Sequence, residues 1–200
     1  MSDQSADQRS RLVRAAWTVV RRSGFDGIKV QLVLKESGLS ARTFYRHFAD
    51  KDSLLVALIE DEYGAVSRRL RRALTDADPD PAAQVSAWIR EMLLAASSPD
   101  RAPRARLFSS YHALMAGAPG ALLRSNQMII EPLEAAVRKG EAAGVFVGDD
   151  PHSDAQQVAR LTAGALNEYL ATEDSSIEQL IDAVVRFALR ALTGSPQPAS

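Results

Sequence analysis

The chain has 200 residues, 46% of them hydrophobic, and a formal net charge of -1. This is enough apolar material for one large domain or two small ones, with roughly 70% of the unfolded surface buried on folding. Cysteine is absent, which excludes disulfides, thiolate metal sites and thiol nucleophiles and favours a reducing compartment.

Apolar residues near the start of the chain recur with helical spacing. Those in residues 9–23 follow the i, i+3, i+4, i+7 periodicity of a helix with one buried face, and Gly24 ends it. A second, short helix is predicted over 30–37. It ends at Gly38, a residue suited to the left-handed turn conformation.

A third helix is predicted over 41–48, where Ser40 offers the N-cap hydroxyl, although the Glu of a full capping box is missing. Asp50 caps a long fourth helix that continues towards Leu74. Two short helices joined by a tight turn form a helix-turn-helix arrangement.

Beyond residue 75, proline- and glycine-containing breaks separate further helical stretches, and no convincing strand pattern occurs. The predicted helices cover 82–96, 104–116, 120–143, 153–172 and 176–193. The fold class is therefore all-α, with about nine helices.

The third predicted helix has two chemically different faces. Phe44 and Phe48 are four residues apart and share a face that the first two helices can cover. The remaining side chains are polar or cationic: Arg42, Thr43, Tyr45, Arg46 and His47. The arginines can offer guanidinium forks to guanine edges, and the Thr and Tyr hydroxyls suit phosphate oxygens. Lys51, in the first turn of the next helix, is well placed if a phosphate lies there.

Charge is distributed unevenly along the chain. Residues 1–75 hold 14 Lys or Arg and 9 Asp or Glu, a net +5, whereas residues 76–200 carry a net -6. A basic module joined to an acidic one is typical of a protein whose basic end faces a polyanion. A chance fluctuation would produce the same difference. For the RRLRR run at 68–72 we favour a solvated helix face.

Residues 38–55, GLSARTFYRHFADKDSLL, resemble the TetR family of one-component transcriptional regulators. The signature is matched at Gly38, Leu39, Ser40, Thr43, Phe44, Tyr45, His47, Phe48, Lys51, Leu54 and Leu55. The resemblance covers about residues 11–59 and includes the GFDG turn at 24–27. It implies that operator DNA is contacted by Lys29, Ser40, Arg42, Thr43, Tyr45, Arg46, His47 and Lys51. The family usually has Thr or Ser at the position of Lys29, so an ionic phosphate contact is expected there.

The resemblance also implies that the last two helices pair with their copies across a two-fold axis, although in a monomer the same residues would simply be core. The predicted dimer interface consists of Val158, Leu161, Leu166, Leu180, Ile181, Val184, Val185 and Leu192. Two copies on a palindrome also supply the specific affinity that one short recognition helix lacks.

Large adaptable apolar residues with a few polar groups suit a small-molecule cavity in the middle of the chain. The candidates are Trp88, Met92, Phe108, Tyr111, His112, Met115 and Met128. Each of them would serve equally well as ordinary core.

An enzyme is not expected. Ser110 and His112 are two residues apart on a predicted helix and do not face each other, which disfavours a nucleophile and base pair. The three histidines are too scattered to indicate a metal site, and no cofactor is expected. No apolar run approaches the roughly 20 residues of a membrane span, and the first residues are polar, so we expect a cytoplasmic protein without a membrane partner.

The sequence favours a homodimeric repressor that a small-molecule effector releases from a palindromic operator. We expect a DNA-binding domain over residues 1–52, a ligand-binding and dimerisation domain over 53–193 and a disordered tail over 194–200. Two alternatives stay open. One is an activator, or a regulator without ligand, of the same fold. The other is a helical small-molecule-binding protein or enzyme with a vestigial DNA-binding end.

Overall fold

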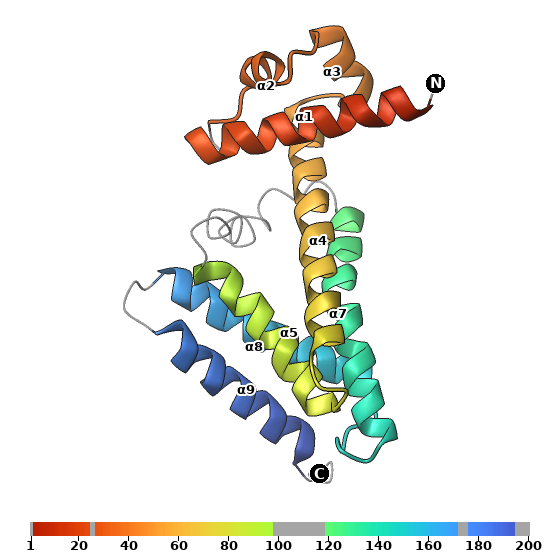
Figure 1. The fold of residues 1–200 in the computed structure, drawn as a ribbon, viewed down its shortest axis with the longest axis vertical. Helices are drawn as coiled ribbons and strands as arrows, with labels where there is room; N and C mark the ends of the chain where they lie inside the picture. The colour runs from red at the N-terminus through yellow and green to blue at the C-terminus, as the bar shows by residue number, and fades with distance from the viewer. Residues whose placement is uncertain (1, 25–26, 98–118, 172–175, 195–200) are drawn as a thin grey trace. The chain divides into compact units, whose positions relative to one another are not determined.

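The computed structural model describes residues 2–24, 27–97, 119–171 and 176–194, and the regular structure in these ranges is entirely helical (Figure 1). The predicted all-α class is confirmed, and the eight helices of the described ranges are close to the nine expected. They are α1 (Ser2–Ser23), α2 (Val30–Ser37), α3 (Ala41–His47), α4 (Lys51–Asp76), α5 (Pro81–Ser97), α7 (Pro119–Ala142), α8 (Pro151–Ala171) and α9 (Ile177–Thr193). The helix predicted over 104–116 and the tail from residue 195 lie outside the described residues.

Helix α1 begins at Ser2, earlier than the predicted start at residue 9. The prediction was wrong there because residues 5–8 carry no apolar stripe, so the periodicity of a buried face does not reveal this turn. Ala6 and Gln8 are nevertheless good helix formers, and the helix continues through them.

The chain divides into two compact units, residues 1–62 and 63–200. In the first unit, one apolar face of α1 packs on α2 and α3. Its fully buried side chains include Leu12, Val33, Phe44, Leu54 and Leu58. Burial of each large side chain contributes about 1.5–3 kcal/mol before the entropy of ordering is subtracted. Trp17 Nε1 also donates to Asp61 Oδ2 at 3.1 Å, which ties α1 to α4 within this unit.

In the second unit, α5 contacts α7, α8 and α9, and it therefore occupies the centre of this core (Figure 1). Trp88 of α5 is only 1% exposed. Its indole Nε1 donates to the carbonyl oxygen of Ile129 in α7 at 3.1 Å. The buried indole thus has the partner that a polar group in a core requires.

A group of carboxylates gathers where α7 is followed by α8. A methyl group on Gly148 would collide with the carboxylates of Asp154 and Glu141, so the backbone at Gly148 lies directly against both side chains. Glu141 Oε1 is enclosed and has no hydrogen-bond partner among the described residues. A side chain at position 148 would therefore disturb this junction.

Burial raises the pKa of Glu141, and the negative charge of Asp154 raises it further, while Arg138 acts in the opposite direction. Burial and the charges of Asp150 and Asp149 likewise raise the pKa of Asp154. Ionised carboxylates at this junction therefore oppose folding.

Replacing Glu141 with Gln should stabilise the second unit at pH 7 by less than about 1 kcal/mol, the scale of partly exposed charge interactions. Because the folded-state pKa is raised, the native carboxyl favours folding only when protonated, and that contribution is lost as the pH rises through the folded-state pKa. The advantage of Glu141→Gln should therefore vanish at about pH 4. Urea unfolding in a Trp17→Phe background, followed by Trp88 fluorescence, measures the effect.

Glu134→Gln is the matched control with the opposite sign. The hydrogen bond with His152 Nδ1, at 2.8 Å, is the main cause that lowers the pKa of Glu134. Removal of this carboxylate should destabilise the unit at pH 7, and the loss should shrink as the pH falls. A destabilised Glu141→Gln at pH 7 would contradict the account of the junction.

Candidate nucleic-acid interface

The turn between α2 and α3 is fixed by a glycine and an arginine. Gly38 has φ 65°, and its N–H donates to the carbonyl oxygen of Leu34 at 2.9 Å. A residue with a Cβ would lose about 1–2 kcal/mol in this left-handed conformation. Arg11 Nη2 donates to the carbonyl oxygen of Ser37 at 3.0 Å, so α1 holds the end of α2. The direction in which α3 leaves the turn is thereby set.

The start of α3 is capped as predicted. Ser40 Oγ accepts a hydrogen bond from the Thr43 N–H at 3.2 Å. The two hydroxyl oxygens also lie 3.0 Å apart, so Thr43 occupies the position of the missing capping-box acid and contacts Ser40 directly. Both hydroxyls are therefore held at the first turn of the helix.

The start of α4 carries a reciprocal cap. Asp50 Oδ1 accepts from the Ser53 N–H at 2.7 Å, and Ser53 Oγ accepts from the Asp50 N–H at 3.1 Å. The Ser53 hydrogen bonds lower the pKa of Asp50, which keeps it ionised at the positive end of the helix. The predicted cap is confirmed. Lys51 is fixed in the first turn of α4 and is half-buried.

An aromatic root holds α3 against the rest of the first unit. Phe44 and Phe48 are buried, and their ring centroids lie 5.6 Å apart. The Tyr45 ring meets the Phe44 ring edge to face, with centroids 5.3 Å apart, yet Tyr45 is 60% exposed. The predicted division of the helix into a buried aromatic face and an exposed polar face is confirmed.

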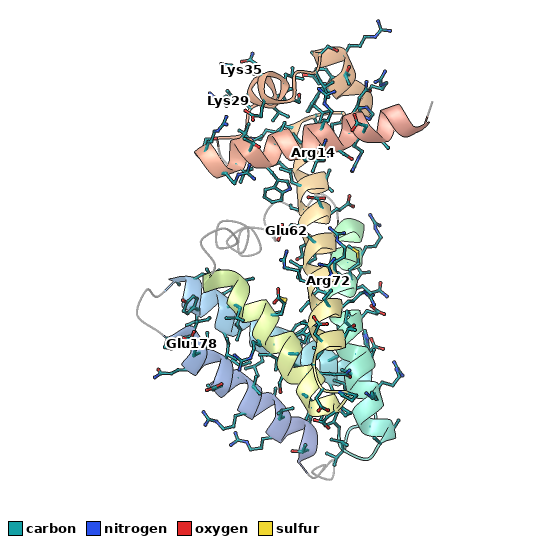
Figure 2. All side chains as sticks on the ribbon, in the orientation of Figure 1. Arg14, Lys29, Lys35, Glu62, Arg72 and Glu178 are labelled. Carbon is teal, nitrogen blue, oxygen red and sulfur yellow. The ribbon has the colours of Figure 1, made fainter. Side chains whose placement is uncertain are left out.

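The exposed side of α3 brings together most of the predicted DNA-contacting residues. Arg42, Tyr45 and Arg46 are exposed, whereas Thr43 and His47 are half-buried. The other three flank this helix or lie farther away: exposed Ser40 before α3, Lys51 after it, and Lys29 at the start of α2 (Figure 2). Lys29 is exposed at the N-cap position of α2, so an anion can reach its ammonium.

His47 carries little positive charge at neutral pH. Burial lowers its pKa, and the charges of Arg46 and Arg9 lower it further. Its Nε2 atom is enclosed, with no hydrogen-bond partner in the part of the chain that the structure describes. A neutral imidazole is a poor phosphate ligand, so the cations of this surface are the neighbouring arginines and lysines.

Two residues of α1 join this surface without having been predicted. Arg46 Nη2 donates to Gln8 Oε1, and the Arg9 guanidinium carbon lies 5.5 Å from the centroid of the Phe48 ring. The cation–π contact presses the N-terminal end of α1 against the root of α3. These contacts join positions nearly forty residues apart, and local spacing carries no signal for them.

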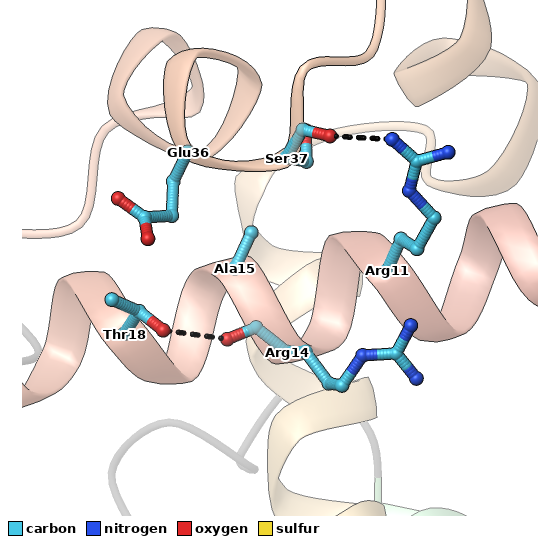
Figure 3. Close-up of a pocket in the computed structure, with 6 residues that line it drawn as sticks. All are labelled: Arg11, Arg14, Ala15, Thr18, Glu36 and Ser37. Carbon is cyan, nitrogen blue, oxygen red and sulfur yellow. Dashed lines mark hydrogen bonds between the residues drawn. The ribbon is translucent and has the colours of Figure 1, made fainter.

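A shallow hollow of about 220 Å³ lies between α1 and α2 (Figure 3). Its lining residues are Arg11, Arg14, Ala15, Thr18, Glu36 and Ser37. Arg11 is engaged with the Ser37 carbonyl, and the Glu36 carboxylate accepts from Arg22 at 2.8 Å. A carboxylate in the lining disfavours a phosphate, so the hollow adds nothing to the basic surface.

The second unit contains the residues predicted for an effector cavity. Trp88 belongs to the core, Met92 is half-buried and Met128 is exposed. The other four candidates, Phe108, Tyr111, His112 and Met115, lie outside the described residues. The structure therefore describes three of the seven predicted positions.

The predicted dimer residues fall into two groups. Five are already buried within the single chain, by the packing of α8 and α9 on α5: Val158, Leu166, Ile181, Val184 and Leu192. Three are half-buried: Leu161, Leu180 and Val185. Phe187, which was not predicted, is 53% exposed on α9, with the Arg190 guanidinium carbon 5.5 Å from its ring centroid.

The described ranges contain neither a metal-binding cluster nor a membrane-spanning helix. Within them, no group of three or more His, Asp or Glu side chains is arranged to hold a metal ion. Among the same residues, no helix combines the length and the apolar character needed to cross a bilayer.

The arginine run at 68–72, predicted to be a solvated face, makes ion pairs with neighbouring helices. Arg69 Nε lies 3.3 Å from Glu91 Oε1, and Arg71 pairs with Glu131.

Residues 12–58 match the family described as "Bacterial regulatory proteins, tetR family". Comparison with curated protein sequences gave no match. Among solved structures, RolR in complex with resorcinol has a TM-score of 0.67 at 21% identity, with 100% of this chain and 99% of that chain covered. A putative TetR-family regulator from Mesorhizobium loti has a TM-score of 0.74 at 20% identity, with 92% and 96% covered.

FadR from Bacillus subtilis, solved with stearoyl-CoA, has a TM-score of 0.72 at 14% identity, with 91% of this chain and 98% of that chain covered. At these identities the solved structures show a shared fold, and the matched N-terminal segment carries the sequence relationship. Residues 12–58 therefore match the tetR-family helix-turn-helix segment, and the chain shares its fold with solved structures of TetR-family transcriptional regulators.

Proposed function

We propose that the chain is a homodimeric repressor that acts in the cytoplasm, binds a palindromic operator and is released from it by a small-molecule effector. The observation that carries the DNA-binding part is α3 itself. Phe44 and Phe48 anchor a capped helix whose other side exposes two arginines and a tyrosine. A helix of this size fits the major groove of B-DNA.

The side chains divide into base-reading and phosphate-binding groups. Arg42 and Arg46 carry planar forks that match the O6 and N7 acceptors of guanine. The hydroxyls and ammonium groups around them suit phosphate oxygens: Ser40, Thr43, Tyr45, Lys29 and Lys51. His47, held neutral, is proposed to contact DNA through shape and hydrogen bonding rather than through charge.

The proposed dimer uses the outer faces of α8 and α9. Leu161, Leu180 and Val185 are only half-buried in the single chain. Phe187, seven residues after Leu180 and therefore on the same face of α9, exposes a large aromatic surface. An exposed aromatic of this size is typical of the centre of a protein interface. The five buried residues of the predicted set would pack α8 and α9 against α5 and so hold this surface in place.

The proposed effector binds in the second unit. RolR and the transcriptional regulator FadR share this fold, and their structures contain a bound small molecule, resorcinol in RolR and stearoyl-CoA in FadR. Trp88, Met92 and Met128, with the four candidates outside the described ranges, remain the proposed ligand residues. By linkage, an effector that weakens DNA binding must itself bind less tightly to the DNA-bound protein.

The alternatives are less well supported. An activator would use the same interface and differ only in where its operator lies. An enzyme, or a binding protein with a vestigial DNA-binding end, would not need the capped α3 with Arg42, Tyr45 and Arg46 exposed on it. We therefore propose no catalytic role.

Substitution of Arg42 or Arg46 by Ala should cost about 1–3 kcal/mol per contacted base and relax the preference at one operator position per half-site. The physical reason is the loss of a bidentate donor that only guanine satisfies. Competition binding on the operator and on its single-base variants measures this. Equal weakening on every DNA sequence would instead make the arginine a phosphate ligand.

Lys51→Ala should weaken binding to operator and random DNA alike. If its ammonium neutralises one phosphate in each subunit, the dependence of log K on log salt should become shallower by about 0.9 per contact. Titrations at several salt concentrations measure the slope. An unchanged slope would remove Lys51 from the interface.

Phe187→Asp should dissociate the dimer while leaving the second unit folded, because position 187 is exposed in the single chain. The monomer should lose operator binding even though every DNA-facing residue is intact, since two half-sites are no longer held on one frame. Sedimentation beside a DNA-binding assay measures both properties.

Two variants serve as controls for Phe187→Asp. Leu123→Asp adds a carboxylate at a position that is 71% exposed on α7 and should stay dimeric. Val184→Asp adds one in the core and should unfold the unit instead. A monomeric Phe187→Asp that binds the operator with native affinity would refute the dimer requirement, and one that stays dimeric would place the interface on another surface.

A further inference from the structure

The guanidinium group of Arg46 is held by a residue of another helix. Arg46 projects from α3, and its Nη2 donates to the amide oxygen of Gln8 in α1. Gln8 is half-buried, whereas Arg46 is exposed. The acceptor is therefore the better anchored partner, and it restricts a side chain that would otherwise sample many rotamers.

The physical effect of this hydrogen bond is preorganisation. A free arginine side chain loses about 2 kcal/mol of rotamer entropy when it is fixed in one geometry. The hydrogen bond with Gln8 removes part of that loss before DNA arrives. One Nη2 hydrogen is engaged, so four of the five guanidinium donors stay available for a base edge.

The chemistry of the holding group matters as well. The Gln8 amide is neutral, so it orients the guanidinium without cancelling its charge or repelling a phosphate. A carboxylate at the same place would do both.

We propose that Gln8 is a positioning residue for sequence recognition: its amide oxygen holds the Arg46 guanidinium in the orientation in which that group reads an operator base. This inference rests on the proposed function, because it requires that Arg46 read a base. Under this proposal α1, which lies outside the helix-turn-helix formed by α2 and α3, contributes to sequence specificity.

The test is the variant Gln8→Met in the full-length chain, combined with Arg46→Ala and separately with Arg42→Ala. Met keeps the length and the apolar stem of Gln and removes the acceptor oxygen. Competition binding with the operator selected by the wild type, each of its single-base variants and random duplex DNA gives both affinity and discrimination for every variant.

Gln8→Met should lower discrimination at the base pair read by Arg46 by about threefold to tenfold, the range of the net contribution of a typical hydrogen bond. Affinity for random DNA and the salt dependence should not change, because no phosphate contact is lost. In the Arg46→Ala background Gln8→Met should have no further effect. In the Arg42→Ala background it should keep its full effect, as expected for independent positions.

Several results would overturn the inference. Unchanged discrimination in Gln8→Met would show that the contact does not position Arg46. Tighter operator binding would show that Gln8 draws Arg46 away from the DNA, and equal weakening on random duplexes would make Gln8 a backbone contact. A wild-type protein that selects no duplex sequence would overturn the proposed function as well, whereas selective wild-type binding with any of the first three results overturns this inference alone.

Discussion

The burial of two aromatic rings on one side of α3 is the constraint on which the DNA-facing surface depends. Phe44 and Phe48 fix the helix rotation about its own axis, and a seven-residue helix has no stability of its own in water. Once these rings are buried, Arg42 and Arg46 have to lie on the solvent side. Loss of either ring would leave the same polar side chains without a defined direction.

Hydrogen bonds at the helix ends fix the position of α3 together with the buried rings of Phe44 and Phe48. Ser40 caps α3, Asp50 and Ser53 cap α4 reciprocally, and Arg11 holds the last carbonyl of α2. Each of these contributes about 1 kcal/mol, which is modest for a whole domain. Their larger effect is geometric, because they set where one helix ends and the next begins. The position of the candidate interface is therefore set largely by hydrogen bonds within the protein.

The N-terminal unit was readable from sequence because its determinants are local, as at Gly38, Ser40 and Asp50. Two features could not be predicted from the sequence. The first turns of α1 have no apolar stripe, so the local pattern does not reveal them, and Gln8 contacts Arg46 only once the chain is folded. The apolar stripe of α9 was assigned to a partner copy, with core as the alternative, and Val184 of that stripe is buried within the single chain. Most of the basic excess of residues 1–75 lies outside the first unit, since residues 1–62 hold 10 basic and 9 acidic residues and the other basic residues are arginines of the second unit.

The most direct test of the central claim, that α3 is a recognition helix carried by a two-fold symmetric protein, is selection of bound duplexes from a random pool by the purified full-length chain. The account predicts enrichment of one sequence with two-fold symmetry, whose half-site centres are separated by about one helical turn, near 10 base pairs, or a multiple of it. It also predicts a conserved guanine within each half-site. A folded protein that enriches no sequence over the starting pool would contradict the account.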